Sequence, residues 1–189
     1  MGRPKLRLPW GGTTILGHLI RQWQSLGARQ IGVVCAANGA VITDELDHLG
    51  FPARARIMNP DPDRGMFSSV QCAACWDGWD GALTHWVLTL GDQPHVREAT
   101  LRAVIEFAAT HPEKICQPMR RGHRRHPVVF PQTAMTALRE SSASNLKTFL
   151  ETPGREWTGF ESDDAGLDLD LDEPADYERA RALDSAAPF

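Results

Sequence analysis

The sequence predicts an α/β fold in which a mostly parallel β-sheet has helices on both faces. Helical and strand patterns alternate along the chain, the predicted strands are short apolar runs, and segments of helical length separate them. The chain has 189 residues, of which 42% are hydrophobic, so it can bury a substantial core. No long linker or internal repeat interrupts the pattern, and we therefore expect residues 1–189 to form a single domain.

The first half of the chain opens with a helical pattern. Thr13 or Thr14 can cap a helix whose apolar residues recur every three or four positions, and Gly27 is placed to end it. Next we expect a buried strand over 30–36, a helix over 41–49, a strand near 53–58 and a helix over 68–76. The clearest strand runs from Thr84 to Leu90 and stops at the turn Gly91-Asp92-Gln93-Pro94.

The second half continues the alternation. We expect a helix over 97–109, strands near 114–118 and 127–130, helices near 133–139 and 144–151, and a strand near 157–160. An acidic segment, 161–176, follows, and a last helix is expected over 174–183, since Pro174 suits a first helical turn.

Charge and hydropathy narrow the function classes. The 20 Lys and Arg against 24 Asp and Glu give a net charge of -4, which argues against a general nucleic-acid binder. The sequence shows no apolar run long enough for a membrane span and no secretion-signal pattern, so we expect a cytoplasmic protein without a membrane partner.

Three acidic residues are candidates for a metal site. In a parallel sheet ligands bind beyond the carboxyl ends of strands, and Asp92 directly follows the clearest strand. Magnesium is usually held by one or two carboxylates and by substrate phosphates, so Asp170 or Asp172 is a candidate for the second ligand. Two alternatives remain open: Asp92 as a turn or helix-capping residue, and the second segment as a solvated acidic loop.

The basic stretch 120–126 also has more than one interpretation. Its sequence is Arg120-Arg121-Gly122-His123-Arg124-Arg125-His126, which suits either an anionic substrate or a solvated loop. Nucleic acid ranks last, because no aromatic residues are interleaved to stack on bases.

Five short segments, taken in order, resemble the molybdenum cofactor cytidylyltransferase family. That family carries M-G-x-P-K-L-L-L-P, G-M-S-S-S-V after Asn-Pro, G-D-Q-P, G-H-P-V-L-F and D-I-D-T-P-E-D. The corresponding segments of this chain are Met1 to Pro9, Gly65 to Val70 after Asn59-Pro60, Gly91 to Pro94, Arg125 to Phe130, and Asp170 to Asp176. Together they extend over nearly the whole chain.

The resemblance implies a Rossmann-like, three-layer nucleotidyltransferase fold that transfers CMP from CTP to molybdopterin and releases pyrophosphate. A molybdenum enzyme that receives the cofactor is a possible partner. The implied residue roles are Lys5 and Arg3 on the triphosphate, Asp92 with Asp170 or Asp172 on Mg²⁺, Gly65, Ser68 and Ser69 on the base, and His126 on the second substrate. Lys5 and Asp92 are the implied catalytic residues.

Several positions depart from the family pattern. Arg125 replaces a Gly, Glu173 replaces a Thr, and residues 141–145 lack the family's G-D-x-G-A-R. Alternative functions are a guanylyl or sugar-phosphate nucleotidyltransferase, or a non-catalytic assembly factor for a molybdenum enzyme. Pro4 favours cytidine, because the guanylyl relatives tend to carry G-x-D-K where this chain has Gly2-Arg3-Pro4-Lys5.

In the family, a strand and a glycine-rich loop of the type L-A-A-G-x-S-x-R precede the Met-Gly pair. The sequence begins at that Met, so we expect the first strand and its loop to be absent from it. Backbone N–H groups of such a loop would cradle the triphosphate. We therefore expect the chain as given to be weakly active or inactive, and upstream codons to encode the missing strand and loop.

Overall fold

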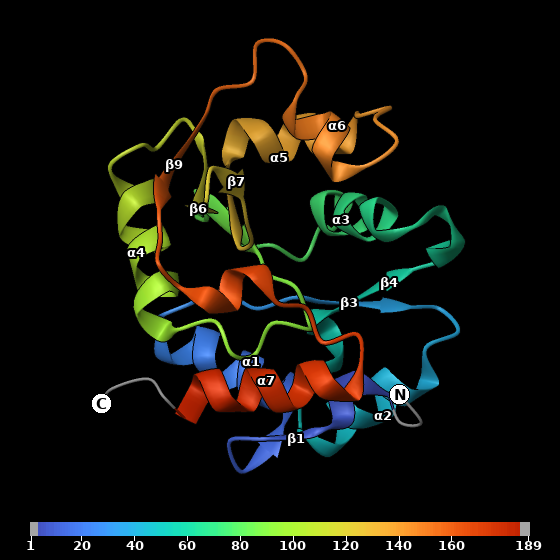
Figure 1. The fold of residues 1–189 in the computed structure, drawn as a ribbon. Coiled ribbons are helices and arrows are strands. Elements are labelled where there is room, and N and C mark those ends of the chain that lie inside the picture. The colour runs from blue at the N-terminus through green and yellow to red at the C-terminus, as the bar shows by residue number, and fades with distance from the viewer. Residues whose placement is uncertain (1–3, 186–189) are drawn as a thin grey trace.

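The computed structural model describes residues 4–185. Arg3, one of the predicted nucleotide-binding residues, lies outside the described residues. Figure 1 shows strands in the middle of the molecule, with α3, α5 and α6 on one side and α1, α2 and α7 on the other. The predicted α/β class and three-layer arrangement are confirmed.

Two groups of strands make up the centre. β3 (Val33–Ala36) pairs in parallel with β4 (Arg56–Asn59). The larger sheet has the order β5-β8-β6-β7, with β9 paired to β6. Its strands are β5 (His85–Leu88), β6 (Ile115–Arg120), β7 (His123–Arg124), β8 (Val128–Pro131) and β9 (Trp157–Glu161).

The larger sheet corrects one detail of the predicted fold, because it is mixed rather than mostly parallel. β8 runs antiparallel to both β5 and β6, whereas β6 and β9 are parallel. Only residues 121–127 separate β6 from β8, and a parallel connection needs about a dozen residues or more. The chain therefore turns back through β7 as a short antiparallel excursion.

The helices follow the predicted spans to within a few residues. They are α1 (Ile15–Ser25), α2 (Ala40–His48), α3 (Met66–Cys75), α4 (Glu98–Ala109), α5 (Gln132–Arg139), α6 (Leu146–Leu150) and α7 (Pro174–Ser185). Short 3-10 turns lie at η1 (Lys5–Arg7), η2 (Ala53–Ala55), η3 (Pro62–Arg64) and η4 (Ala165–Asp168). No helix in residues 4–185 is long and apolar enough to cross a membrane.

The amino-terminal segment is held on the fold by α1 and α2. A small hairpin of β1 (Pro9–Trp10) and β2 (Thr13–Thr14) leads into α1, whose cap is Thr14: its hydroxyl oxygen accepts from the Gly17 N–H at 3.2 Å. The same hydroxyl donates to buried Glu45 on α2, which also accepts from Arg7. These bonds hold the chain beside Lys5 in place.

Candidate active site

The structure brings Lys5 and Asp92 together, although 87 positions separate them in the sequence. Asp92 lies in the loop that follows β5, near the carboxyl end of that strand, as predicted. Lys5 Nζ donates to Asp92 Oδ2 at 2.7 Å and lies 3.4 Å from Asp172 Oδ1. The Asp92 side chain is only 22% exposed, whereas that of Asp172 is 74% exposed. A lysine ammonium thus bridges two acidic segments that are distant in sequence.

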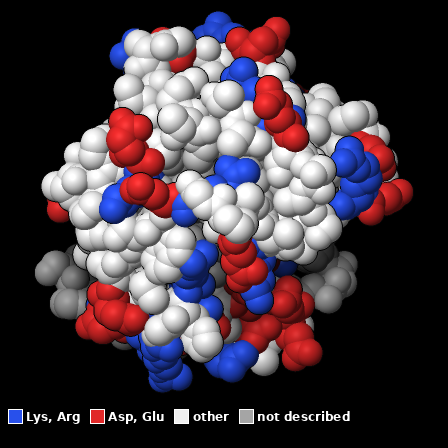
Figure 2. Space-filling model, turned by 90° about the horizontal axis from the view of Figure 1, so that it is seen from above, with Lys and Arg blue, Asp and Glu red and all other residues white. Residues whose placement is uncertain are grey.

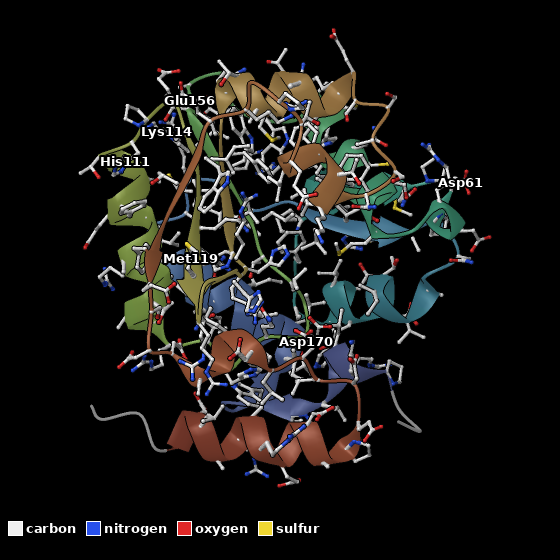
Figure 3. All side chains as sticks on the ribbon, turned by 45° about the horizontal axis from the view of Figure 1, so that its top comes forward. Asp61, His111, Lys114, Met119, Glu156 and Asp170 are labelled. Atoms are coloured by element: carbon white, nitrogen blue, oxygen red, sulfur yellow. The ribbon has the colours of Figure 1, made fainter. Side chains whose placement is uncertain are left out.

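An alternation of leucine and aspartate places the second acidic segment. Leu171 is fully buried against Trp10 and Ile15, and Leu169 packs on the same cluster. In an extended chain successive side chains point to opposite sides. Asp170 and Asp172, which alternate with these leucines, therefore point away from the core. Figure 3 labels Asp170, where the chain leaves the η4 turn towards α7. The Leu171 N–H donates to the Asp92 carbonyl oxygen at 3.3 Å, which ties the two segments together.

The charge of Lys5 depends on this arrangement. Burial lowers the pKa of its ammonium, but the hydrogen bond and charge of Asp92, with a smaller contribution from Asp172, raise that pKa above its ordinary value overall. Lys5 is therefore positively charged at neutral pH. It is suited to neutralise a triphosphate oxygen when it exchanges a carboxylate partner for a phosphate.

His126, the predicted residue for the second substrate, lies near the same carboxylates. Burial lowers the pKa of its imidazole, and this outweighs a hydrogen bond with the Leu88 backbone and the charges of Asp170 and Asp92, which act to raise it. The ring is therefore neutral at pH 7. Its Nδ1 atom is buried and has no hydrogen-bond partner among the described residues. The ring thus has an unsatisfied polar atom beside the acidic cluster.

Asp92 is not the cap of the helix that follows it. α4 begins at Glu98, and the carboxylate near its start belongs to Asp164, which accepts from the Arg97 N–H and the Thr100 hydroxyl. The hydrogen bond found for the Asp92 carboxylate comes from Lys5. This geometry argues against the capping alternative for Asp92.

The predicted base-recognition residues form a separate hydrogen-bonded cluster at the start of α3. Buried Asn59 donates from Nδ2 to Ser68 Oγ at 2.8 Å and to Ser69 Oγ at 3.0 Å. The Ser68 hydroxyl lies within hydrogen-bond distance of the carbonyls of Asp61 and Gly65, so its proton is engaged. Gly65 is exposed at φ +86°, a conformation that favours glycine.

This cluster lies apart from the acidic residues. Figure 3 labels Asp61 at one edge of the molecule and Asp170 near the lower middle. No hydrogen bond or ion pair found within residues 4–185 joins Gly65, Ser68 or Ser69 to Lys5 or Asp92. A ligand that contacts both groups must span the distance between them.

Most of the basic stretch is already engaged within the fold. Arg120 and Arg125 both bind Asp168, with N–O distances of 2.9 and 2.7 Å. The Arg124 guanidinium carbon lies 3.7 Å from the centre of the Trp157 ring. In Figure 2 basic and acidic side chains are interspersed on the face shown, without a broad field of one sign. These contacts favour a structural role for much of this loop.

The carboxylates fit a magnesium ion only when substrate supplies further ligands. Within residues 4–185 no group of three or more His, Cys, Asp or Glu side chains is arranged to hold a metal. Asp92 and Asp172 converge on one cation, the Lys5 ammonium, and Asp170 neighbours them. Two carboxylates together with phosphate oxygens and water are an ordinary set of ligands for Mg²⁺.

Sequence reasoning missed two residues that shape the site. Gln93 donates from Nε2 to Asp170 Oδ1 at 2.8 Å, and Glu45 anchors Arg7 beside the Lys5 turn. Gln93 belongs to a motif that was recognised, but its partner lies 77 positions away, so local spacing gave no signal. Glu45 occurs in an ordinary amphipathic helix pattern.

Comparison with protein families decides the broad class. The model of the MobA-like NTP transferase domain matches residues 1–157. The chain belongs to this family. It is therefore classed as a nucleotidyltransferase, in agreement with a site that combines a lysine with several carboxylates.

Solved structures support the fold. Rv0371c from Mycobacterium tuberculosis H37Rv is 22% identical, with a TM-score of 0.73 over 99% of this chain and 92% of the other; its manganese complex has also been solved. A nucleotidyl transferase from Methanothermobacter is 20% identical, with a TM-score of 0.74 over 94% and 83%. Molybdopterin-guanine dinucleotide biosynthesis protein A from Archaeoglobus fulgidus is 12% identical, with a TM-score of 0.65 over 98% and 93%. No curated protein sequence matches the chain.

Proposed function

We propose that this nucleotidyltransferase transfers CMP from CTP to the phosphate of molybdopterin and releases pyrophosphate, with Mg²⁺ as its metal ion. The observation that carries the proposal is the junction of Lys5 with Asp92 and Asp172 beyond β5. It combines a positive charge for phosphate oxygens with carboxylates for a divalent cation.

The chemistry requires little beyond positioning and neutralisation of charge. The terminal phosphate oxygen of molybdopterin is already a nucleophile; it attacks the α-phosphorus of CTP, and the bond to the β-phosphate bridging oxygen breaks as pyrophosphate leaves. Lys5 binds and neutralises triphosphate oxygens, which stabilises the charge that develops on the leaving group. Asp92 and either Asp170 or Asp172 would hold Mg²⁺, which would supply Lewis-acid stabilisation of the developing negative charge. Neutral His126 is suited to donate or accept a hydrogen bond with the acceptor.

Two sequence features support CTP over other nucleotides. Pro4 stands in the position that distinguishes cytidylyl from guanylyl relatives, and residues 65–70 resemble the family's base-recognition segment. The Asn59–Ser68–Ser69 hydrogen bonds hold that segment in a defined conformation. A rigid segment suits discrimination between bases, because little ordering is needed on binding.

Isothermal titration of CTP, GTP and ATP into the chain with Mg²⁺ tests the proposal. We expect CTP to bind at least about tenfold more tightly, which corresponds to about 1.4 kcal/mol. The variant Asp80→Asn, which breaks an ion pair with Arg29 (2.8 Å) outside the site, should show the same order of nucleotide affinities as the unaltered chain. Equal affinities, or a preference for GTP, would contradict the cytidylyl assignment.

A further inference from the structure

We propose that Gln93 and His95 are positioning residues that clamp segment 164–172 onto the loop after β5 and so set the approach of Asp170 to Asp92. The inference rests on the proposed function, because it assigns both carboxylates to one metal–nucleotide site. Neither side chain belongs to the residues expected to touch metal or nucleotide.

His95 makes the central contact of the clamp. Its Nε2 lies 3.1 Å from the carbonyl oxygen of Gly166 and 3.1 Å from that of Leu169. Carbonyl oxygens only accept hydrogen bonds, so Nε2 must carry the proton and donate to both. One neutral imidazole thereby joins a carbonyl within the η4 turn to the carbonyl of Leu169, the residue that follows the turn.

The surroundings of His95 keep the ring neutral and leave it little freedom. Burial lowers the pKa of the ring, which outweighs the opposing effects of the Gly166 and Leu169 hydrogen bonds and of the Asp164 and Asp170 charges. The side chain is 3% exposed. A Cβ atom added at Gly166 would meet His95 Cδ2 at 3.0 Å, which is tighter than ordinary contact, so glycine suits this close approach of the η4 backbone.

Gln93 makes the second contact, directly to a carboxylate of the site. Its side chain is 7% exposed, and its Nε2 donates to Asp170 Oδ1 at 2.8 Å. Asp170 itself is exposed, and an unrestrained exposed carboxylate samples several rotamers. The Gln93 amide restrains one oxygen of Asp170, as partners outside the immediate ligands commonly do for metal-binding carboxylates.

The backbone completes the junction between the two segments. Leu171 N–H donates to the Asp92 carbonyl oxygen at 3.3 Å, one residue beyond the Asp170 that Gln93 contacts. Asp164, at the other end of the segment, is held by the Arg97 N–H and the Thr100 hydroxyl. Segment 164–172 is thus attached at successive points, and His95 and Gln93 supply the side-chain contacts nearest to Asp170.

Binding of Mn²⁺ to the full chain, followed by electron paramagnetic resonance with and without CTP, tests the clamp apart from turnover. We expect His95→Phe to weaken Mn²⁺ binding about tenfold, because the Gly166 and Leu169 carbonyls both lose the His95 N–H and the segment that carries Asp170 is held less firmly. His95→Gln should bind within about threefold of the wild type, because its amide can donate from a similar position.

Two further variants separate positioning from stability. Gln93→Met removes only the hydrogen bond to Asp170, and we expect about tenfold weaker Mn²⁺ binding with the fold retained. Leu138→Ala, in a fully buried position of another core cluster, should lower the melting temperature and leave Mn²⁺ affinity unchanged.

The outcomes distinguish the clamp from the function on which it rests. If His95→Phe and Gln93→Met bind Mn²⁺ as tightly as the wild type, or if Leu138→Ala weakens binding equally, the clamp is refuted while the proposed function stands. If the wild-type chain binds neither Mn²⁺ nor Mn²⁺ with CTP, the metal–nucleotide site and the clamp are both refuted.

Discussion

Asp92→Asn separates the proposed metal role of Asp92 from a structural role. The variant removes one charge and leaves the shape of the side chain nearly unchanged. The lost ion pair with Lys5 is partly exposed, at 37% and 22% for the two side chains, so its contribution to stability is at most about 1 kcal/mol. Lys5 also keeps Asp172 at 3.4 Å as a partner. We therefore expect the melting temperature to change by no more than about 4 °C.

The same substitution should have a large effect on the metal. Loss of a residue that only supports a ligand typically costs 10–100-fold in affinity, so loss of a direct ligand should cost at least about 100-fold. The assay is titration of Mn²⁺ with CTP, accompanied by thermal unfolding of each variant. Asp80→Asn, which disrupts an exposed ion pair elsewhere, should leave both readouts almost unchanged. A metal role for Asp92 is excluded if Asp92→Asn melts many degrees lower but binds Mn²⁺ and CTP normally.

Three further predictions follow from the contacts around the site. Lys5→Gln should weaken CTP binding by about tenfold or more in titration calorimetry, because the substitution removes the positive charge that faces the triphosphate. An unchanged affinity would exclude this role for Lys5. Asn59→Leu should lower the free energy of unfolding by about 2–3 kcal/mol in urea melts, because the Ser68 and Ser69 hydroxyls lose their donor in a buried cluster. An unchanged free energy of unfolding in this variant would contradict the prediction. Burial lowers the pKa of His95 from 6.5, so its contribution to stability is present above that value and lost as pH falls through the folded-state pKa. The melting temperature should therefore drop between pH 7.5 and 5.5, with a smaller drop in His95→Gln, and equal drops would count against this assignment.

Local patterns predicted the elements whose causes are local. α1 forms where its apolar spacing predicted and is capped by Thr14, because capping and periodicity act within a few residues. The direction of β8 was not predicted from these patterns, because an apolar strand looks alike in parallel and antiparallel pairs. The short interval between β6 and β8 does contain that information, through the minimum length of a parallel crossover.

The candidate site was predictable where topology alone places a residue. Asp92 follows an apolar strand, so its place in the loop after β5 could be predicted, and its role in binding a ligand stays a prediction. The role of Gln93 and His95 was not predictable from local pattern, since both act on a segment more than 70 positions away. The same holds for Asp168, whose ion pairs with Arg120 and Arg125 engage a loop that the sequence left open as a substrate site.

Nucleotidyl transfer itself is the most direct test of the central claim. The chain, in excess over molybdopterin, is mixed with Mg²⁺ and CTP, GTP or ATP, and pyrophosphate and the dinucleotide product are followed by mass spectrometry. We expect slow formation of a cytosine dinucleotide with an equal amount of pyrophosphate from CTP, much less product with GTP or ATP, and none with Asp92→Asn. A guanine dinucleotide as the main product, or undiminished transfer by Asp92→Asn, would contradict it.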